Sequence, residues 1–270
     1  LGIIDYYYFT EGNKYALKNY SKVNEIIRYE RPYLGFLSAF NFILSLLFFK
    51  KFKKLIFPIL ISCLAIIIVT LISARLALII IFFSCLIYLF NKFKLKNSII
   101  YLTLLTSLFV LVFLTNQSIK ARFIQIKNDA RLITWRGAYK IFNEGEKYIT
   151  GIGSQKKINN LYVNYYNTYE NYQSLDEKKR FLKKNYNTHN QYINELLRGG
   201  FMGLFLFLLP QYLIIRKIFK NNSFLNYILL FSIVCFLTVE NVIQRQVGVY
   251  LYIIILSLSN ILSSSNKCNR

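Results

Sequence analysis

The stretch LIFPILISCLAIIIVTLI, which occupies residues 55–72, contains no charged side chain. As a helix it approaches the length of roughly 17 to 25 residues that crosses a hydrocarbon core. Over the whole chain, 55% of the residues are hydrophobic and only 17% are charged, a composition typical of membrane proteins. The sequence therefore predicts an all-α fold, a polytopic bundle of transmembrane helices.

Similar apolar blocks occur on both sides of this stretch. With it, they run over residues 33–49, 55–72, 76–90, 98–115, 201–215, 225–239 and 247–262. We therefore expect about seven spans, four within 33–115 and three within 201–262. The rest of the predicted organisation is an extracytoplasmic segment 1–32, a long extracytoplasmic loop 116–200 containing short amphipathic helices, and a cytoplasmic tail 263–270.

The first residue of the chain, the four cysteines and the single histidine lead to further expectations. The chain begins at Leu1 and its only methionine is Met202, so we expect the gene product to begin upstream. The four cysteines suggest neither a disulfide framework nor a zinc site. The single histidine, His189, excludes a multi-histidine metal site within these residues, and we expect no metal and no cofactor.

The orientation of the spans follows from lysine and arginine, which stay on the cytoplasmic side when they flank a span. They cluster after the first, third, fifth and seventh blocks, whereas the alternate short connections hold only Arg75 and Arg245. This pattern places segment 116–200 on the outer face, which in a bacterial inner membrane is the periplasmic face.

The long segment 116–200 holds fifteen basic and seven acidic residues. Long loops cross the membrane largely regardless of charge, so this excess does not contradict the orientation. Attraction of an anionic substrate or of lipid phosphates is the simplest reason for it, and nucleic acid is excluded as a partner on this side. The Asn/Tyr tract 161–174 suits sugar recognition, but a mobile interfacial loop explains it better.

Two segments bring arginines to this face. Arg75 stands alone between two apolar blocks, where snorkelling to the interface explains it as well as a function does. The run DARLITWR, residues 129–136, predicts an amphipathic helix on the membrane that Asn128 or Asp129 caps. Its apolar residues at helical spacing are Leu132, Trp135, Tyr139 and Phe142. A surface helix whose arginines touch lipid headgroups gives the same pattern without catalysis.

A third polar cluster lies before the block at Phe201. We expect Asn187 or Thr188 to cap a short helix and His189 to lie in its first turn. An isolated histidine is more often structural than catalytic, but this one lies among polar residues at the mouth of a predicted bundle. Glu240, at the edge of the sixth block, needs a partner: Arg245 is the ordinary one, and His189 or an arginine the functional one.

The order of these features resembles the O-antigen ligase and Wzy-type O-antigen polymerase family, from about Arg31 onward. The matching positions are Ser73 and Arg75, Arg131 and Trp135, Gly151 and Gly153, His189 and Asn190, Gly200 and Gly203, and Glu240 with Gly248. The chain departs from the family pattern at Ala74, which separates Ser73 from Arg75, and at residues 148–150, where the family often has a proline.

The resemblance implies a membrane glycosyltransferase of surface polysaccharide or lipopolysaccharide biosynthesis. The donor would be a glycan linked to undecaprenyl pyrophosphate, and the acceptor a hydroxyl of a glycan or of the lipid A core. Arg75 and Arg131 would bind the pyrophosphate, and His189 would act as general base in an inverting reaction without a metal. Trp135, Asn190, Glu240 and Arg245 would support them.

Other functions stay open at this point. Within the family, the acceptor distinguishes ligation, polymerisation and protein O-glycosylation, and no residue identifies it. A transporter of polysaccharide or lipid-linked glycan is the alternative from another class. Transporters place their functional charges near the bilayer midplane, whereas the predicted spans here are almost free of charge. A non-catalytic membrane scaffold is the third alternative.

Overall fold

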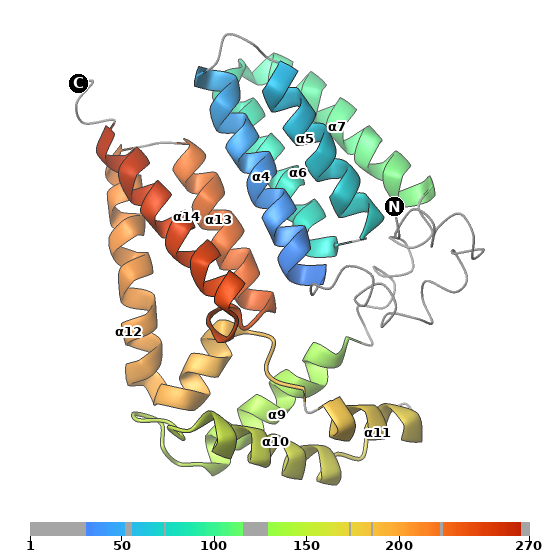
Figure 1. Ribbon diagram of the computed structural model, residues 1–270, viewed down its shortest axis with the longest axis vertical. Coiled ribbons are helices and arrows are strands. Elements are labelled where there is room, and N and C mark those ends of the chain that lie inside the picture. The colour runs from blue at the N-terminus through green and yellow to red at the C-terminus, as the bar shows by residue number, and fades with distance from the viewer. Residues whose placement is uncertain are drawn as a thin grey trace. The chain divides into compact units, whose positions relative to one another are not determined.

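The computed structural model describes residues 31–51, 56–72, 74–115, 129–172, 174–184, 186–221 and 224–265, and this part of the chain is helical without strands. Residues 1–30, Ser73, Asn128 and the tail from 266 lie outside it. The helices are α4 (Arg31–Lys51), α5 (Ile56–Leu71), α6 (Arg75–Lys92), α7 (Leu95–Thr115), α9 (Ala130–Glu144), α10 (Gln155–Thr168), α11 (Leu175–Lys184), α12 (Gln191–Asn221), α13 (Phe224–Val239) and α14 (Gln246–Ser265), with a 3-10 turn, η2 (Val242–Gln244), before α14 (Figure 1).

Each predicted apolar block coincides with a helix, so the predicted fold class is confirmed at this level. In the described part of the chain, four helices are long and apolar enough to cross a membrane: Arg31–Phe49, Arg75–Lys92, Gln191–Lys220 and Gln246–Ser263. The other three apolar helices are shorter: Ile56–Leu71, Leu95–Leu111 and Phe224–Val239. The number of seven crossings and the side that each loop faces stay predictions.

The chain divides into two compact units. The first comprises Leu1–Lys127, Asn221–Cys235 and Ile261–Arg270, and the second comprises Asn128–Lys220 and Phe236–Asn260. In the first unit, α4 packs against α5 and α6, and α6 packs against α7 (Figure 1). The contacts include a hydrogen bond of 2.6 Å between the hydroxyls of Ser45 and Ser62, and a close approach of Gly35 to Ala74.

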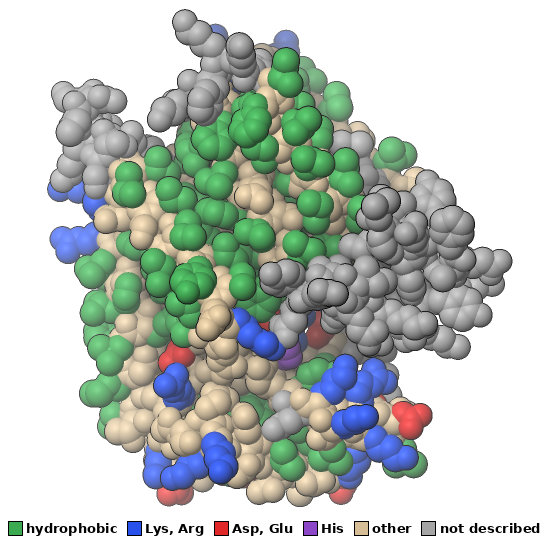
Figure 2. Space-filling view, viewed as in Figure 1, with side chains coloured by type: hydrophobic (Ala, Val, Ile, Leu, Met, Phe, Trp, Pro, Cys, Tyr) green, Lys and Arg blue, Asp and Glu red, His purple; other side chains and the backbone are tan. Residues whose placement is uncertain are grey.

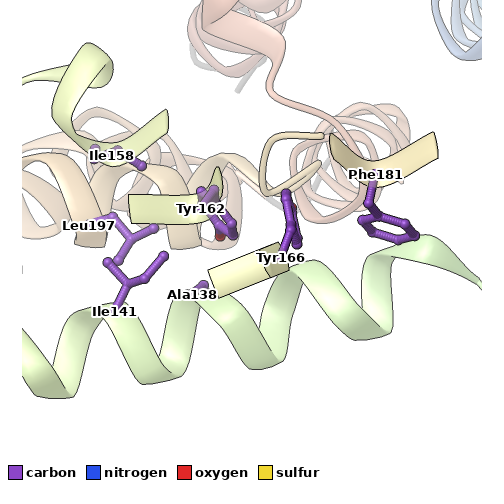
Figure 3. Close-up of a cluster of buried hydrophobic side chains, with 7 residues drawn as sticks. All are labelled: Ala138, Ile141, Ile158, Tyr162, Tyr166, Phe181 and Leu197. Carbon is purple, nitrogen blue, oxygen red and sulfur yellow. The ribbon is translucent and has the colours of Figure 1, made fainter. Parts of the chain in front are cut away.

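The second unit has a core of its own, formed by α9, α10, α11 and the first part of α12. Figure 3 shows its buried side chains gathered between these helices. They are Ala138, Ile141, Ile158, Tyr162, Tyr166, Phe181 and Leu197. Two of the tyrosines also hold the helices by hydrogen bonds, since Tyr162 donates to the Thr134 carbonyl and Tyr166 to the Tyr186 carbonyl.

This core corrects one expectation from the sequence. The Asn/Tyr tract is not a mobile loop, because most of it is helix α10 and Tyr162 and Tyr166 are 1% and 0% exposed. On α9, Leu132 and Tyr139 of the predicted membrane-facing side are exposed, and the contact of this side with the membrane stays a prediction. The side of α9 that packs inside the unit carries Thr134, Gly137, Ala138 and Ile141, and Gly137 lets the Tyr165 ring come close to the helix.

Helix α12 bends sharply at Gly200, whose φ of 61° and ψ of −157° are not helical (Figure 1). The bend leaves backbone groups without helical partners, and residues 148–153 supply them. The amides of Ile152 and Gly153 donate to the carbonyls of Leu197 and Arg198, both at 2.8 Å, where the short first part of α12 ends.

The same loop serves the helix that begins after the bend. The amides of Phe201 and Met202 donate to the carbonyls of Tyr148 and Ile149, at 2.8 and 3.1 Å. A Cβ atom at Gly200 would collide with the Ile149 carbonyl, so the two backbones meet only because this residue is glycine. Within this unit, the Gly-x-Gly motif therefore braces the bend.

Candidate functional site

Arg131 lies at the start of α9, between two carboxylates. Asp129 caps the helix as predicted, since its side chain accepts from the Arg131 amide, at 3.1 Å. Its other oxygen is 3.3 Å from Arg131 Nη1. Arg131 Nη2 donates to Glu240 Oε1 at 3.2 Å, and the two residues are 109 positions apart in the sequence. Arg131 Nε is buried and has no hydrogen-bond partner among the described residues.

Glu240 joins this arginine to the histidine. Its second oxygen, Oε2, is 3.3 Å from His189 Nδ1. The Glu240 side chain is only 7% exposed, whereas that of His189 is 31% exposed. A buried carboxylate needs positive or donating partners, and here Arg131 and the imidazole are those partners. Of the two alternatives for Glu240, the structure therefore shows the pairing with His189 and an arginine.

Every residue from Asn187 to Gln191 forms a hydrogen bond with a residue of the turn 240–244. Two of these bonds go to Asn241, whose Oδ1 accepts from Thr188 Oγ1 and from the Asn190 amide, both at 2.9 Å. Gln191 Oε1 accepts from the Ile243 amide at 2.9 Å. The remaining two are the Asn187 side chain with Gln244, and the His189 ring with Glu240. The turn after α13 thus holds the histidine segment along its whole length.

The structure corrects the predicted start of the helix that follows His189. The helix begins at Gln191, and Asn190 caps it, since Asn190 Oδ1 accepts from the Ile193 amide at 3.0 Å. His189 therefore lies before the cap and not in the first turn. Its φ of 43° is left-handed, a conformation that a residue with a Cβ rarely adopts without support.

Trp135 lies one turn beyond Arg131 on α9 and contacts the same segment. Its indole Nε1 donates to the carbonyl of Thr188 at 2.9 Å. This bond ties the helix that carries Arg131 to the residue before His189. The ring of Tyr186, three residues before His189, lies 6.1 Å from the His189 ring. Burial raises the pKa of Tyr186, which stays a neutral phenol, although nearby Arg180 acts in the opposite direction.

The structure brings together five of the seven predicted site residues: Arg131, Trp135, His189, Asn190 and Glu240. Arg245 is exposed and follows η2. Arg75 is the first residue of α6 and belongs to the first unit, so its part in the site stays a prediction.

Three site residues were missed from the sequence: Thr188, Asn241 and Gln244. Gln244 Oε1 accepts from Asn187 Nδ2, while its Nε2 donates to Gln155 and Asn194, at 3.2 and 3.3 Å. The available signal was the run of amides in residues 240–246, which is unusual between two apolar blocks. It did not reveal that these amides meet a second polar run about fifty positions earlier.

Positive charge surrounds this cluster on the second unit. Lys and Arg side chains gather around α9, α10 and α11, whereas hydrophobic side chains cover the span part of α12 (Figure 2). Among them, Lys179, Arg180, Lys183 and Lys184 are exposed on α11. The site therefore combines a buried carboxylate and a half-open imidazole with basic surroundings, which suits an anionic substrate and a proton transfer.

Apolar helices of this length, together with such a polar cluster, define a multi-pass membrane protein with a candidate catalytic centre. A family model described as O-antigen ligase matches residues 60–208, more than half of the chain's 270 residues. The chain belongs to the O-antigen ligase family. No curated protein and no solved structure matches it.

Proposed function

We propose that this protein transfers a glycan from an undecaprenyl-pyrophosphate carrier to an acceptor hydroxyl. The observation that supports this most is the continuous contact from Arg131 through Glu240 to His189, in a chain of the O-antigen ligase family. These residues supply a positive charge, a buried carboxylate and a base, the groups that the reaction needs. The reaction takes place at the outer face of the membrane, which is the periplasmic face of a bacterial inner membrane.

His189 is the general base in this proposal. With Nδ1 turned to Glu240, a proton on Nδ1 leaves Nε2 free to accept one from the attacking hydroxyl. Glu240 then stabilises the imidazolium that forms and keeps the ring in one orientation, as a carboxylate does in hydrolytic triads. The partial exposure of His189 gives an acceptor access to the ring.

The bond changes balance without an added reagent. The acceptor oxygen forms a bond to the anomeric carbon while the bond from this carbon to the pyrophosphate oxygen breaks, which inverts the configuration. The hydroxyl proton goes to His189, and the electron pair leaves with the pyrophosphate. Guanidinium groups stabilise the developing charge, so the proposed reaction uses no metal.

Arg131 is proposed to bind this leaving group. Its two terminal nitrogens are held by Asp129 and Glu240, but Nε is buried without a partner among the described residues. The Arg131 side chain is 24% exposed, which gives an anionic ligand access to the guanidinium group. Arg75 is the proposed second arginine, carried over from the family resemblance, and Trp135, Asn190 and Arg245 support the site.

The experiment follows glycan transfer in membranes that contain the full-length protein. His189→Ala, Arg131→Ala and Arg75→Ala are compared with the parent at matched expression, and lipid-linked donor and product are both measured. Arg136→Ala is the matched control for Arg131→Ala, because Arg136 is exposed on the same helix. We expect the three variants to lose product while donor accumulates at the outer face, and the control to keep its activity.

Other results would reject the proposal. Product formation in all three variants contradicts the assigned residues. Donor that accumulates on the cytoplasmic side indicates a transporter of lipid-linked glycan. In an active parent, the chemical nature of the product separates ligation to the lipid A core, polymerisation and protein O-glycosylation.

A further inference from the structure

Asn241 holds the chain on both sides of His189 with one atom. Its Oδ1 accepts from Thr188 Oγ1 and from the Asn190 amide, each at 2.9 Å. These donors belong to the residues directly before and after the histidine. Asn241, Thr188 and Asn190 are 3%, 0% and 8% exposed, so these bonds lie inside the protein, where leaving a polar group unpaired is costly.

The histidine needs such support because its backbone is strained. A residue with a Cβ at a φ of 43° persists only where its surroundings fix it, at a cost of about 1–3 kcal/mol. The His189 amide donates to Asn187 Oδ1 at 3.1 Å, and Asn187 in turn donates to Gln244 at 3.2 Å. Asn241 and Gln244 therefore fix the residues around His189 from the same turn that carries Glu240.

The turn 240–244 carries both Glu240, which orients the His189 ring, and Asn241, which holds the His189 backbone. Glu240 contacts the His189 ring. The adjacent Asn241 holds the position and direction of the backbone that carries this ring. A movement of the histidine segment against the turn changes the distance between Nδ1 and Oε2. It also changes the direction in which Nε2 points. Displacements of about 1 Å can cost a reaction about 100-fold in rate.

We infer that Asn241 is a positioning residue for the transfer reaction, which acts through His189 and touches neither donor nor acceptor. This inference rests on the proposed function for its effect on the rate. It makes an independent statement about the free protein: without Asn241, the imidazole is no longer held against Glu240.

The test compares Asn241→Ala with Gln155→Ala in the full-length protein. Gln155 belongs to the same group of amides, but its side chain is hydrogen-bonded to Gln244 and Asn159. The first readout is kcat and KM for the lipid-linked donor. We expect Asn241→Ala to lower kcat about 100-fold with little change in KM, because the binding groups stay in place while the base is misaligned. Gln155→Ala should keep both values.

The second readout needs no transfer activity. Diethyl pyrocarbonate acylates imidazole nitrogen. The rate of His189 acylation is measured in membranes without substrate, by mass spectrometry of the peptide that contains His189. We expect this rate to rise in Asn241→Ala, because the ring is released from Glu240, and to stay at the parent value in Gln155→Ala.

Thr188→Val is the second variant, chosen in case Asn241→Ala fails to fold. It removes one of the two bonds to Asn241 and nearly preserves the side-chain volume, so a smaller fall in kcat and a smaller rise in acylation are expected. An unchanged acylation rate in the folded variants would overturn the inference, whatever happens to the activity. If His189→Ala still transfers glycan, the proposed base is wrong, while the acylation rates still decide whether Asn241 holds His189.

Discussion

The Tyr192 hydroxyl donates to Gln211 Oε1 at 3.1 Å, although the two residues are 19 positions apart in α12. In a straight helix this separation would span about 28 Å, at a rise of about 1.5 Å per residue. The contact therefore requires the short first part of α12 to fold back against the part that follows Gly200. This arrangement fixes the helix that Asn190 caps, and with it the chain that carries His189.

The bend leads to the first prediction. Gly200→Ala should lower the free energy of unfolding by about 1–3 kcal/mol or more, since it combines a strained φ with a collision against the Ile149 carbonyl. Thermal unfolding in detergent measures this change. Gly199→Ala is the control, because a Cβ atom there meets nothing within 4 Å. Equal melting temperatures for the two variants would contradict the proposed role of the bend.

The second prediction concerns the charge of Glu240. Glu240→Gln keeps the shape of the side chain but leaves Arg131 without one of its two carboxylates and the imidazolium without a counter-charge. We expect glycan transfer to fall about 100-fold or more, because the base loses its orientation and its stabilisation. Glu144→Gln, which changes an exposed carboxylate on α9, should transfer at the parent rate. Full activity of Glu240→Gln would remove this residue from the mechanism.

The third prediction concerns the tyrosine core of the second unit. Tyr166→Phe deletes the hydrogen bond of 2.7 Å to the Tyr186 carbonyl and should cost about 1 kcal/mol of stability. Tyr169→Phe, at the residue that directly follows this helix, keeps its ring contacts with Tyr165 and Tyr172 and should have little effect. Chemical unfolding of the purified protein compares the two. A larger loss in Tyr169→Phe would contradict the packing described for this core.

The fourth prediction is a loss of stability at alkaline pH. Burial, with nearby Tyr165, Glu177 and Tyr169, raises the pKa of Tyr172 to about 12 from an ordinary value of 10.0. Burial also raises the pKa of Tyr162 and Tyr166. The folded protein then holds these protons at a pH where the unfolded chain releases them. Stability is therefore fully present below pH 10 and falls as the pH rises from 10 towards 12.

The measurement is the melting temperature between pH 8 and pH 11, for the parent and for Tyr172→Phe. The slope should be steeper in the parent, because the variant lacks one of the raised groups. A melting temperature that rises over this range would have the wrong sign and would contradict the buried tyrosines.

Much of the fold was predictable because its rules are local. Apolar blocks such as residues 55–72 give helices from their own composition, and Asp129 caps α9 with an oxygen only two residues from its donor. The start of the helix after His189 was predicted wrongly, because Asn187, Thr188 and Asn190 are all good caps by type. Asn190 is the cap because Asn241, from a distant part of the chain, accepts hydrogen bonds from the Thr188 hydroxyl and from the Asn190 amide.

The candidate site shows the same limit. The residue types were evident, since a lone histidine, a carboxylate at a span edge and an arginine before a tryptophan stand out among apolar blocks. The pairing of Glu240 with Arg131 was left open, because it joins residues 109 positions apart and Arg245 offered a local alternative. The side of α9 that packs inside the protein had no sequence signal, since Gly137 carries no hydrophobic side chain, yet it is where Tyr165 approaches the helix.

The turn 240–244 also sets an order of events during synthesis. Residues 187–191 leave the ribosome before the turn that binds every one of them, and at about 5–20 residues per second the delay lasts several seconds. During this interval the histidine segment lacks Glu240, Asn241 and Gln244, and Arg131 lacks one of its carboxylates. The site is completed only after α13 and the turn behind it have been made, so a chain that ends before Glu240 contains the histidine but not the surroundings that hold it.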